Sequence, residues 1–256
     1  MLALSSVSAF SDNYIWVLHD RSDALAVDPG DAGPLLAFLD QHRLTLRAIL
    51  ITHRHADHIG GLAELSARYP KARVIGPATL SDASEPVGAG QTVSVLGLDF
   101  AVMAVPGHTL DHLAYYATPW LFCGDTLFGA GCGRLFEGTA AQMLASLRRL
   151  AALPPETLIC PAHEYTVANL QFARQAEPSN ININQRLARD KAKRDQHRST
   201  LPCQLAEELA TNPFLRSDQP SIRQTIEQKE QRIFSNDEEI FAALRRWKDG
   251  FKVQDV

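Results

Sequence analysis

Apolar and polar positions alternate in short blocks over the first two thirds of the chain. The blocks at 14–18 and 24–27 predict the two strands of a hairpin, with the polar residues 20–23 as its turn. Further apolar runs predict strands at 46–51, 74–76, 92–96, 100–105, 120–123 and 158–160. Leucines at helical spacing predict helices at 34–42 and 62–69, whereas turn-forming residues predict a loop at 79–90 and a turn at 97–99.

The pattern changes near residue 164, where strand-like runs end. Helical spacing then predicts helices at 165–176, 185–196, 204–209, 222–233 and 236–247. We therefore expect a mixed domain at 1–165 and an all-helical domain at 166–256. For the first domain, periodicity indicates only an α/β or α+β class.

A cluster of metal-ligand side chains directly follows the apolar run 46–51. It contains His53, His55, Asp57 and His58. In an extended backbone, residues two apart project to the same side, so His53 and His55 can share one metal. Asp57 and His58 are adjacent and need a turn to converge, and the glycines at 60–61 supply a permissive backbone. Two differently aimed pairs indicate two metals.

Three more candidate ligands follow the ends of other predicted strands. They are His108, Asp125 and His163. A single histidine or aspartate at a strand end is usually an ordinary loop residue. If the strands share one orientation, however, their carboxyl ends lie along one edge and these side chains come together there. Asp28 and Thr109 are candidates to hold imidazoles in place, whereas His112 is not expected to be a ligand.

Composition narrows the class of protein. The 256 residues are 45% hydrophobic and 21% charged with a net charge of −4, which gives no basic field for nucleic acid or anionic membrane. The first residues have no basic segment followed by a long apolar run, so we expect neither a signal peptide nor a membrane span. Four cysteines without CxxC spacing predict thiols in a reducing, cytoplasmic compartment. We also expect a monomer.

Other catalytic patterns are missing from the sequence. The glycine-rich stretch 129–133 lacks the spacing of a dinucleotide-binding loop, and no P-loop or Ser-His-Asp nucleophile is evident. Metal-assisted chemistry is therefore the leading hypothesis.

The cluster from Thr52 to Gly61, with the later strand-end residues, resembles the metallo-β-lactamase superfamily. The resemblance implies an α+β fold, the αββα sandwich, here followed by the all-helical domain. It also implies two divalent ions, zinc first, with iron or manganese as alternatives. One ion would be held by His53, His55 and His108, the other by Asp57, His58 and His163, with Asp125 bridging both.

Further stretches narrow the resemblance to glyoxalase II, the hydroxyacylglutathione hydrolases. They are 131–139, 163–166, 205–208, 211–216 and 245–249. The resemblance implies cleavage of the thioester S-D-lactoylglutathione to D-lactate and glutathione, the second step of methylglyoxal detoxification. A metal-bridging hydroxide would attack the carbonyl, with Asp57 and Asp125 as catalytic carboxylates. The domain at 166–256 would complete the glutathione pocket.

The same resemblance assigns substrate-binding residues, namely Arg134, Phe136, Tyr165, Arg245 and Lys248. Arg245 and Lys248 are three residues apart and share a face of the predicted helix at 236–247 and its continuation. Some family members carry Lys at 134 and Tyr at 136, so Phe136 here lacks a hydroxyl that could bind glutathione.

Three alternatives remain open at the level of sequence. One is a mononuclear-iron dioxygenase acting on glutathione persulfide, which oxygen uptake and a single metal would support. Another is a two-metal hydrolase of broader thioester specificity. The third is a catalytically silent protein that binds glutathione conjugates, which metal analysis would test.

Overall fold

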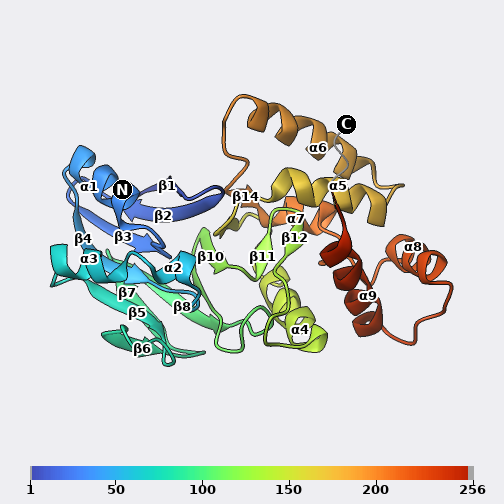
Figure 1. The fold of residues 1–256 in the computed structure, drawn as a ribbon, viewed down its shortest axis with the longest axis horizontal. Helices are drawn as coiled ribbons and strands as arrows, with labels where there is room; N and C mark the ends of the chain where they lie inside the picture. Colours follow the sequence, from blue (N-terminus) through green and yellow to red (C-terminus); the bar gives the residue numbers. More distant parts are fainter. Residues whose placement is uncertain (1, 253–256) are drawn as a thin grey trace. The chain divides into compact units, whose positions relative to one another are not determined.

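The computed structural model describes residues 2–252. By its internal contacts the chain forms two compact units, each built from two segments. The first unit combines the chain up to Ala104 with Asp111–Gly124, and the second combines Val105–Leu110 with the chain from Asp125 onward. In Figure 1 the strand-rich part runs from blue to green and the helices after residue 164 from gold to red.

The first unit contains a six-stranded sheet in the order of the sequence. Its strands are β1 (Ala3–Ala9), β2 (Asn13–His19), β3 (Asp23–Val27), β4 (Thr45–Leu50), β5 (Arg73–Pro77) and β6 (Glu85–Val87). The strands from β1 to β3 pair antiparallel and those from β3 to β6 pair parallel. Parallel neighbours need crossover segments: α1 (Ala32–His42) connects β3 to β4, α2 (Ala56–Ile59) and α3 (Leu62–Arg68) connect β4 to β5, and a segment without a helix connects β5 to β6.

Helices α1 and α3 bury their leucines against this sheet. Leu35 and Leu39 of α1, with Leu62 and Leu65 of α3, join one hydrophobic cluster with residues of β1 to β5. Asp31 caps α1 by accepting a hydrogen bond from the backbone N–H of Gly33. The packing fixes β4, and therefore the loop that leaves its carboxyl end.

A second antiparallel group in this unit consists of β7 (Thr92–Val95), β8 (Leu98–Ala104), β9 (Leu113–Ala117) and β10 (Trp120–Gly124). Its first turn consists of Leu96 and Gly97, both with positive φ (52° and 75°). Two such residues match the twist of the flanking strands. The turn therefore lies at 96–97 rather than at the predicted 97–99.

The second unit is mainly helical. Its strands are β11 (Leu127–Phe128), β12 (Gly131–Cys132), β13 (Leu158–Pro161) and β14 (Cys203–Gln204). Its helices are α4 (Ala140–Ala151), α5 (Thr166–Ala176), α6 (Ile181–Asp195), α7 (Leu205–Thr211), α8 (Pro220–Glu230) and α9 (Asp237–Gly250). The five helices predicted after residue 164 are thus all present, with shifted ends.

Several elements escaped the sequence pattern. Strands β1, β6, β9, β11 and β12 and helices α2 and α4 were not predicted, although a capping box formed by Thr139 and Gln142 marks the start of α4. The expectation that strands end near 164 was wrong for β14, which pairs with β13. This strand is two residues long, too short to give a period. Helix α8 ends before 233, because Gln231 is left-handed with φ 51°.

Two global expectations can be compared with the described residues. Within 2–252, no helix is long and apolar enough to cross a membrane. All four cysteines are buried and none forms a disulfide there. The domain boundary expected at 165/166 stays a prediction.

Candidate metal centre

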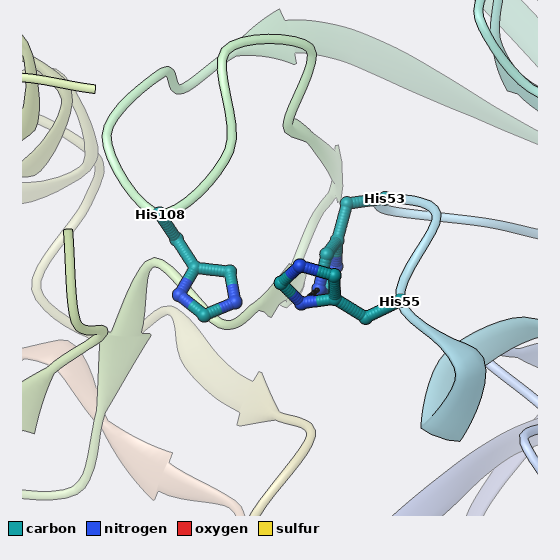
Figure 2. Close-up of side chains that lie close together, drawn as sticks. All are labelled: His53, His55 and His108. Atoms are coloured by element: carbon teal, nitrogen blue, oxygen red, sulfur yellow. Dashed lines mark hydrogen bonds between the residues drawn. The ribbon is translucent and has the colours of Figure 1, made fainter. Parts of the chain in front are cut away.

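The loop after β4 brings two imidazoles together within the first unit. His53 Nε2 lies 3.0 Å from His55 Nδ1, and the ring centroids are 4.6 Å apart. In Figure 2 both side chains leave the loop on the same side, and their rings overlap in the view. This is the same-side projection that the alternation of an extended chain predicts. His53 is fully buried, so the pair has a fixed geometry.

Asp28 organises this loop from the end of β3. Its carboxylate accepts hydrogen bonds from the backbone N–H of Thr52 (2.8 Å) and the Thr52 hydroxyl (2.7 Å). The same carboxylate lies 3.1 Å from His58 Nδ1. A carboxylate at Nδ1 favours the Nδ1–H tautomer, which directs the Nε2 lone pair the other way, as in metal-binding histidines. Asp28 therefore contacts an imidazole as expected, whereas no hydrogen bond joins the Thr109 hydroxyl to one in the described part of the chain.

The second pair of candidate ligands, Asp57 and His58, precedes two glycines whose backbone packs closely against a neighbouring loop. A Cβ on Gly60 would lie 2.5 Å from the carbonyl oxygen of Gly30, and one on Gly61 2.5 Å from that of Pro29. Glycine is therefore required at both positions. His58 Nε2 lies 3.6 Å from the Asp57 carboxylate, so this pair converges through the predicted turn.

Two further residues of the first unit support these ligands and were missed in the sequence. The buried ring of His112 stacks on that of His53, with centroids 4.6 Å apart and planes 19° apart. Asn13 donates from Nδ2 to the Asp57 carboxylate at 3.2 Å. His112 stands close to His108 in the sequence, which was a usable signal. Asn13 is far from Asp57 in sequence and gave none.

In the second unit, Asp125 faces two imidazoles with its two oxygens. Oδ1 lies 3.3 Å from His163 Nε2, and Oδ2 lies 3.4 Å from His108 Nε2. His108 Nδ1 lies 2.9 Å from the carbonyl oxygen of Arg134, which fixes its proton on Nδ1. One carboxylate with an imidazole at each oxygen agrees with the bridging role predicted for Asp125, which stays a prediction.

Aromatic side chains flank these two imidazoles. The Tyr165 ring stacks on His163 with centroids 4.9 Å apart and planes 4° apart. Phe136 meets His108 edge-on at 5.1 Å. Both aromatic side chains are exposed, Phe136 by 63% and Tyr165 by 37%, so they present apolar surface beside the candidate ligands.

The basic residues of α9 occupy different environments. Arg245 is 4% exposed and donates from Nη1 to the carbonyl oxygen of Cys132 at 2.7 Å. Its Nη2 lies 2.9 Å from Asp249. Burial, with the nearby positive charges of Arg245 and Arg134, lowers the pKa of Lys248 to about 8. The carboxylate-binding role predicted for Arg245 and Lys248 stays a prediction.

The donor chemistry fits divalent metal ions. Histidine and aspartate groups able to bind a metal occur in the chain, and they include all seven predicted ligands. Neutral imidazoles and carboxylates suit zinc, iron and manganese.

Comparison with known proteins shows which class of protein this chain belongs to. Residues 10–163 match the family model described as the metallo-β-lactamase superfamily. The fold and the histidine-rich loop are thus those of a metallo-β-lactamase-like protein, which confirms the expected fold class. Residues 164–251 match the model described as the hydroxyacylglutathione hydrolase C-terminus.

Whole-length relatives narrow the class further. A hydroxyacylglutathione hydrolase from Photobacterium profundum is 52% identical over 98% of this chain and 100% of its own length. One from Stenotrophomonas maltophilia is 49% identical with the same coverage. The chain belongs to the hydroxyacylglutathione hydrolase family.

Solved structures agree on the fold. ETHE1 from Myxococcus xanthus is 27% identical with a TM-score of 0.66, covering 97% of this chain and 98% of that chain. TTHA1623, crystallised in a di-iron-bound form, is also 27% identical with a TM-score of 0.51, covering 63% of this chain and 91% of that chain.

Proposed function

We propose that the chain is a thioester hydrolase that cleaves S-2-hydroxyacylglutathiones, with S-D-lactoylglutathione giving D-lactate and glutathione. The observation that carries this proposal is the whole-length relationship to proteins named hydroxyacylglutathione hydrolase, 48% to 52% identical. The reaction is the second step of methylglyoxal detoxification.

The proposed metal centre uses all seven candidate ligands. His53, His55 and His108 would hold one ion, Asp57, His58 and His163 would hold the other, and Asp125 would be shared by both. Three combinations of these side chains could each hold a metal ion, and Figure 2 draws His53, His55 and His108. The di-iron form of TTHA1623 supports a two-metal site in this fold. We expect zinc, with iron or manganese as alternatives.

When bound, the metals polarise the thioester carbonyl and lower the pKa of water to about 7. The chain supplies the rest. Asp57, held by Asn13, orients the attacking water. Asp28 and the Arg134 carbonyl keep His58 and His108 in one tautomer. The leaving thiol has an ordinary pKa near 8.5, so it departs as a thiolate without a general acid.

The glutathione part of the substrate is assigned to the second unit. Phe136 and Tyr165 offer exposed apolar faces next to His108 and His163. Glutathione carries two carboxylates, and the positive charges of Arg134 and Lys248 suit them. Arg245 already binds the Cys132 carbonyl and Asp249. We therefore assign it two roles: it holds the backbone at Cys132 in place, and its positive charge attracts the carboxylates of glutathione.

The dioxygenase alternative is less well supported. The match of residues 164–251 to the hydroxyacylglutathione hydrolase C-terminus favours the hydrolase. We further propose that the protein acts as a cytoplasmic monomer that binds neither nucleic acid nor membrane, in keeping with its four cysteines without disulfides and its net charge of −4.

Parallel assays with metal-loaded protein test the proposal. S-D-lactoylglutathione should be cleaved at least about 100-fold more efficiently than a simple acyl thioester without glutathione, because the pocket adds binding energy. Equal cleavage of both would leave a thioesterase of broad specificity. Oxygen consumption with glutathione persulfide, without thioester cleavage, would replace the proposal by the dioxygenase.

A further inference from the structure

A two-stranded hairpin lies between the candidate ligand Asp125 and the substrate-binding residue Arg134. Strands β11 and β12 pair Leu127 with Cys132 and Phe128 with Gly131. Two strands of two residues are too short to hold their own position, because isolated hairpins are marginal even when longer. Something else must therefore place this hairpin.

Side chains from α5 and α7 bind the hairpin backbone. Asn212 donates from Nδ2 to the carbonyl oxygens of Phe128 (3.2 Å) and Gly131 (2.9 Å). Glu208 accepts from the backbone N–H of Ala130 at 2.8 Å. Asn169 of α5 donates to the carbonyl oxygen of Gly129 at 3.0 Å. Four consecutive hairpin residues are thus held by side chains.

Glu208 and Asn212 also hold each other, and neither is exposed. Asn212 Nδ2 lies 2.8 Å from the Glu208 carboxylate, and Arg186 Nη2 lies 2.6 Å from it. A buried charge is costly unless its partners stay in place. Displacement of the hairpin would remove one of those partners, the Ala130 amide, so the clamp resists movement.

The hairpin in turn contacts the candidate site. The Phe128 ring meets His163 at 5.8 Å and Tyr165 at 5.3 Å, both edge-on. Beyond Cys132 the chain continues to Arg134, whose carbonyl oxygen faces His108 Nδ1. Both imidazoles that face Asp125 therefore depend on this segment.

We infer that Asn212 and Glu208 are positioning residues for the hydrolysis, which set the β11–β12 hairpin and through it His108, His163 and Tyr165. Neither residue touches the proposed ligands, and both act through the hairpin backbone. The inference rests on the proposed function for its link to thioester cleavage.

The test compares two asparagine-to-alanine variants in the holoenzyme. Asn212→Ala should lower kcat for S-D-lactoylglutathione about tenfold and speed zinc loss to a chelator by a similar factor, as for other groups that orient metal ligands. Asn180→Ala is the matched control, because Asn180 donates to Ala210 and Glu177 but not to the hairpin. It should leave both quantities within about twofold.

Two results would overturn the inference. One is folded Asn212→Ala protein with wild-type kcat and zinc retention, and the other is equal losses in both variants. If Asn212→Ala does not fold, Asn169→Ala takes its place, because it removes a single contact to the hairpin. Asn169→Ala should speed zinc loss about threefold, and an unchanged rate of zinc loss would refute the inference. Zinc loss needs no substrate, so an inactive wild-type protein would refute the proposed function and still leave this test intact.

Discussion

At the scale of the residue, metal binding by a histidine depends on which group faces each of its two imidazole nitrogens. Asp28 faces Nδ1 of His58 and the Arg134 carbonyl faces Nδ1 of His108, so Nε2 is the ring nitrogen available to a metal in both. Asp125 is the residue on which most depends, since each of its oxygens lies near a different imidazole.

Replacing Asp125 should therefore disturb both metals. We expect Asp125→Ala to retain at most one metal ion per chain and to lose at least about 100-fold in kcat. Metal content by mass spectrometry and S-D-lactoylglutathione hydrolysis measure the two effects. Two retained ions with full activity would show that Asp125 is not a bridge.

Lys248 gives a prediction about pH. Its pKa is lowered to about 8, so its positive charge is present below that pH and is lost as the pH rises through it. If the ammonium binds a glutathione carboxylate, kcat/KM should fall about tenfold between pH 7 and pH 9.

Lys248→Arg should shift this decline upward, because a guanidinium stays charged. The control is Lys191→Arg, an exposed lysine on α6, which should keep the wild-type profile. Identical profiles for wild-type and Lys248→Arg protein would remove Lys248 from the pocket.

At the scale of the element, short hairpins and loops are placed by the larger elements around them. The loop after β4 depends on helices packed against a six-stranded sheet, and the β11–β12 hairpin depends on α5 and α7. Such segments tolerate little added volume, because their neighbours are already in contact.

Gly131→Ala tests this at the hairpin. A Cβ at Gly131 would lie 2.4 Å from Nδ2 of Asn169, the atom that holds the Gly129 carbonyl. We expect a loss of about 2 kcal/mol in the free energy of unfolding, about 5 °C in Tm, and about tenfold in kcat.

Gly88→Ala is the matched control, since its nearest neighbour would be Gln91 Oε1 at 3.9 Å. It should change neither Tm nor kcat. If Gly131→Ala kept wild-type stability and activity, the hairpin could shift without a loss in the free energy of unfolding or in kcat, which would contradict this prediction.

At the scale of the whole molecule, the proposed ligands come from four separate strand-end loops along the chain. Metals that bind only the folded chain stabilise it by mass action, by about 4 kcal/mol at a thousandfold excess over Kd.

Removal of the metals with a chelator should accordingly lower Tm by about 10 °C, as measured by differential scanning fluorimetry. Re-addition of zinc should restore it. Asp125→Ala should respond less, because it is expected to hold fewer ions. A Tm that is independent of chelator would argue against a metal site in the native protein.

The sequence by itself determined the histidine cluster, the candidate ligands at strand ends, most strands and the helical C-terminal region. These are local patterns, because alternation, helical spacing and turn residues act over a few positions. The family relationship was also readable in motifs such as 131–139, because those residues stand contiguous in the chain.

Only the tertiary structure assigned partners that are distant in sequence. Asn13 at Asp57, the Arg134 carbonyl at His108 and Asn212 at the hairpin join positions that no local pattern relates. Only the tertiary structure also revealed the short strands β6 and β14, which are too short to show an alternating pattern. They form because a neighbouring strand offers backbone groups for hydrogen bonding. The candidate ligands could be predicted from the order of residues along the chain. The groups that orient those side chains could not, because they come together only when the chain packs.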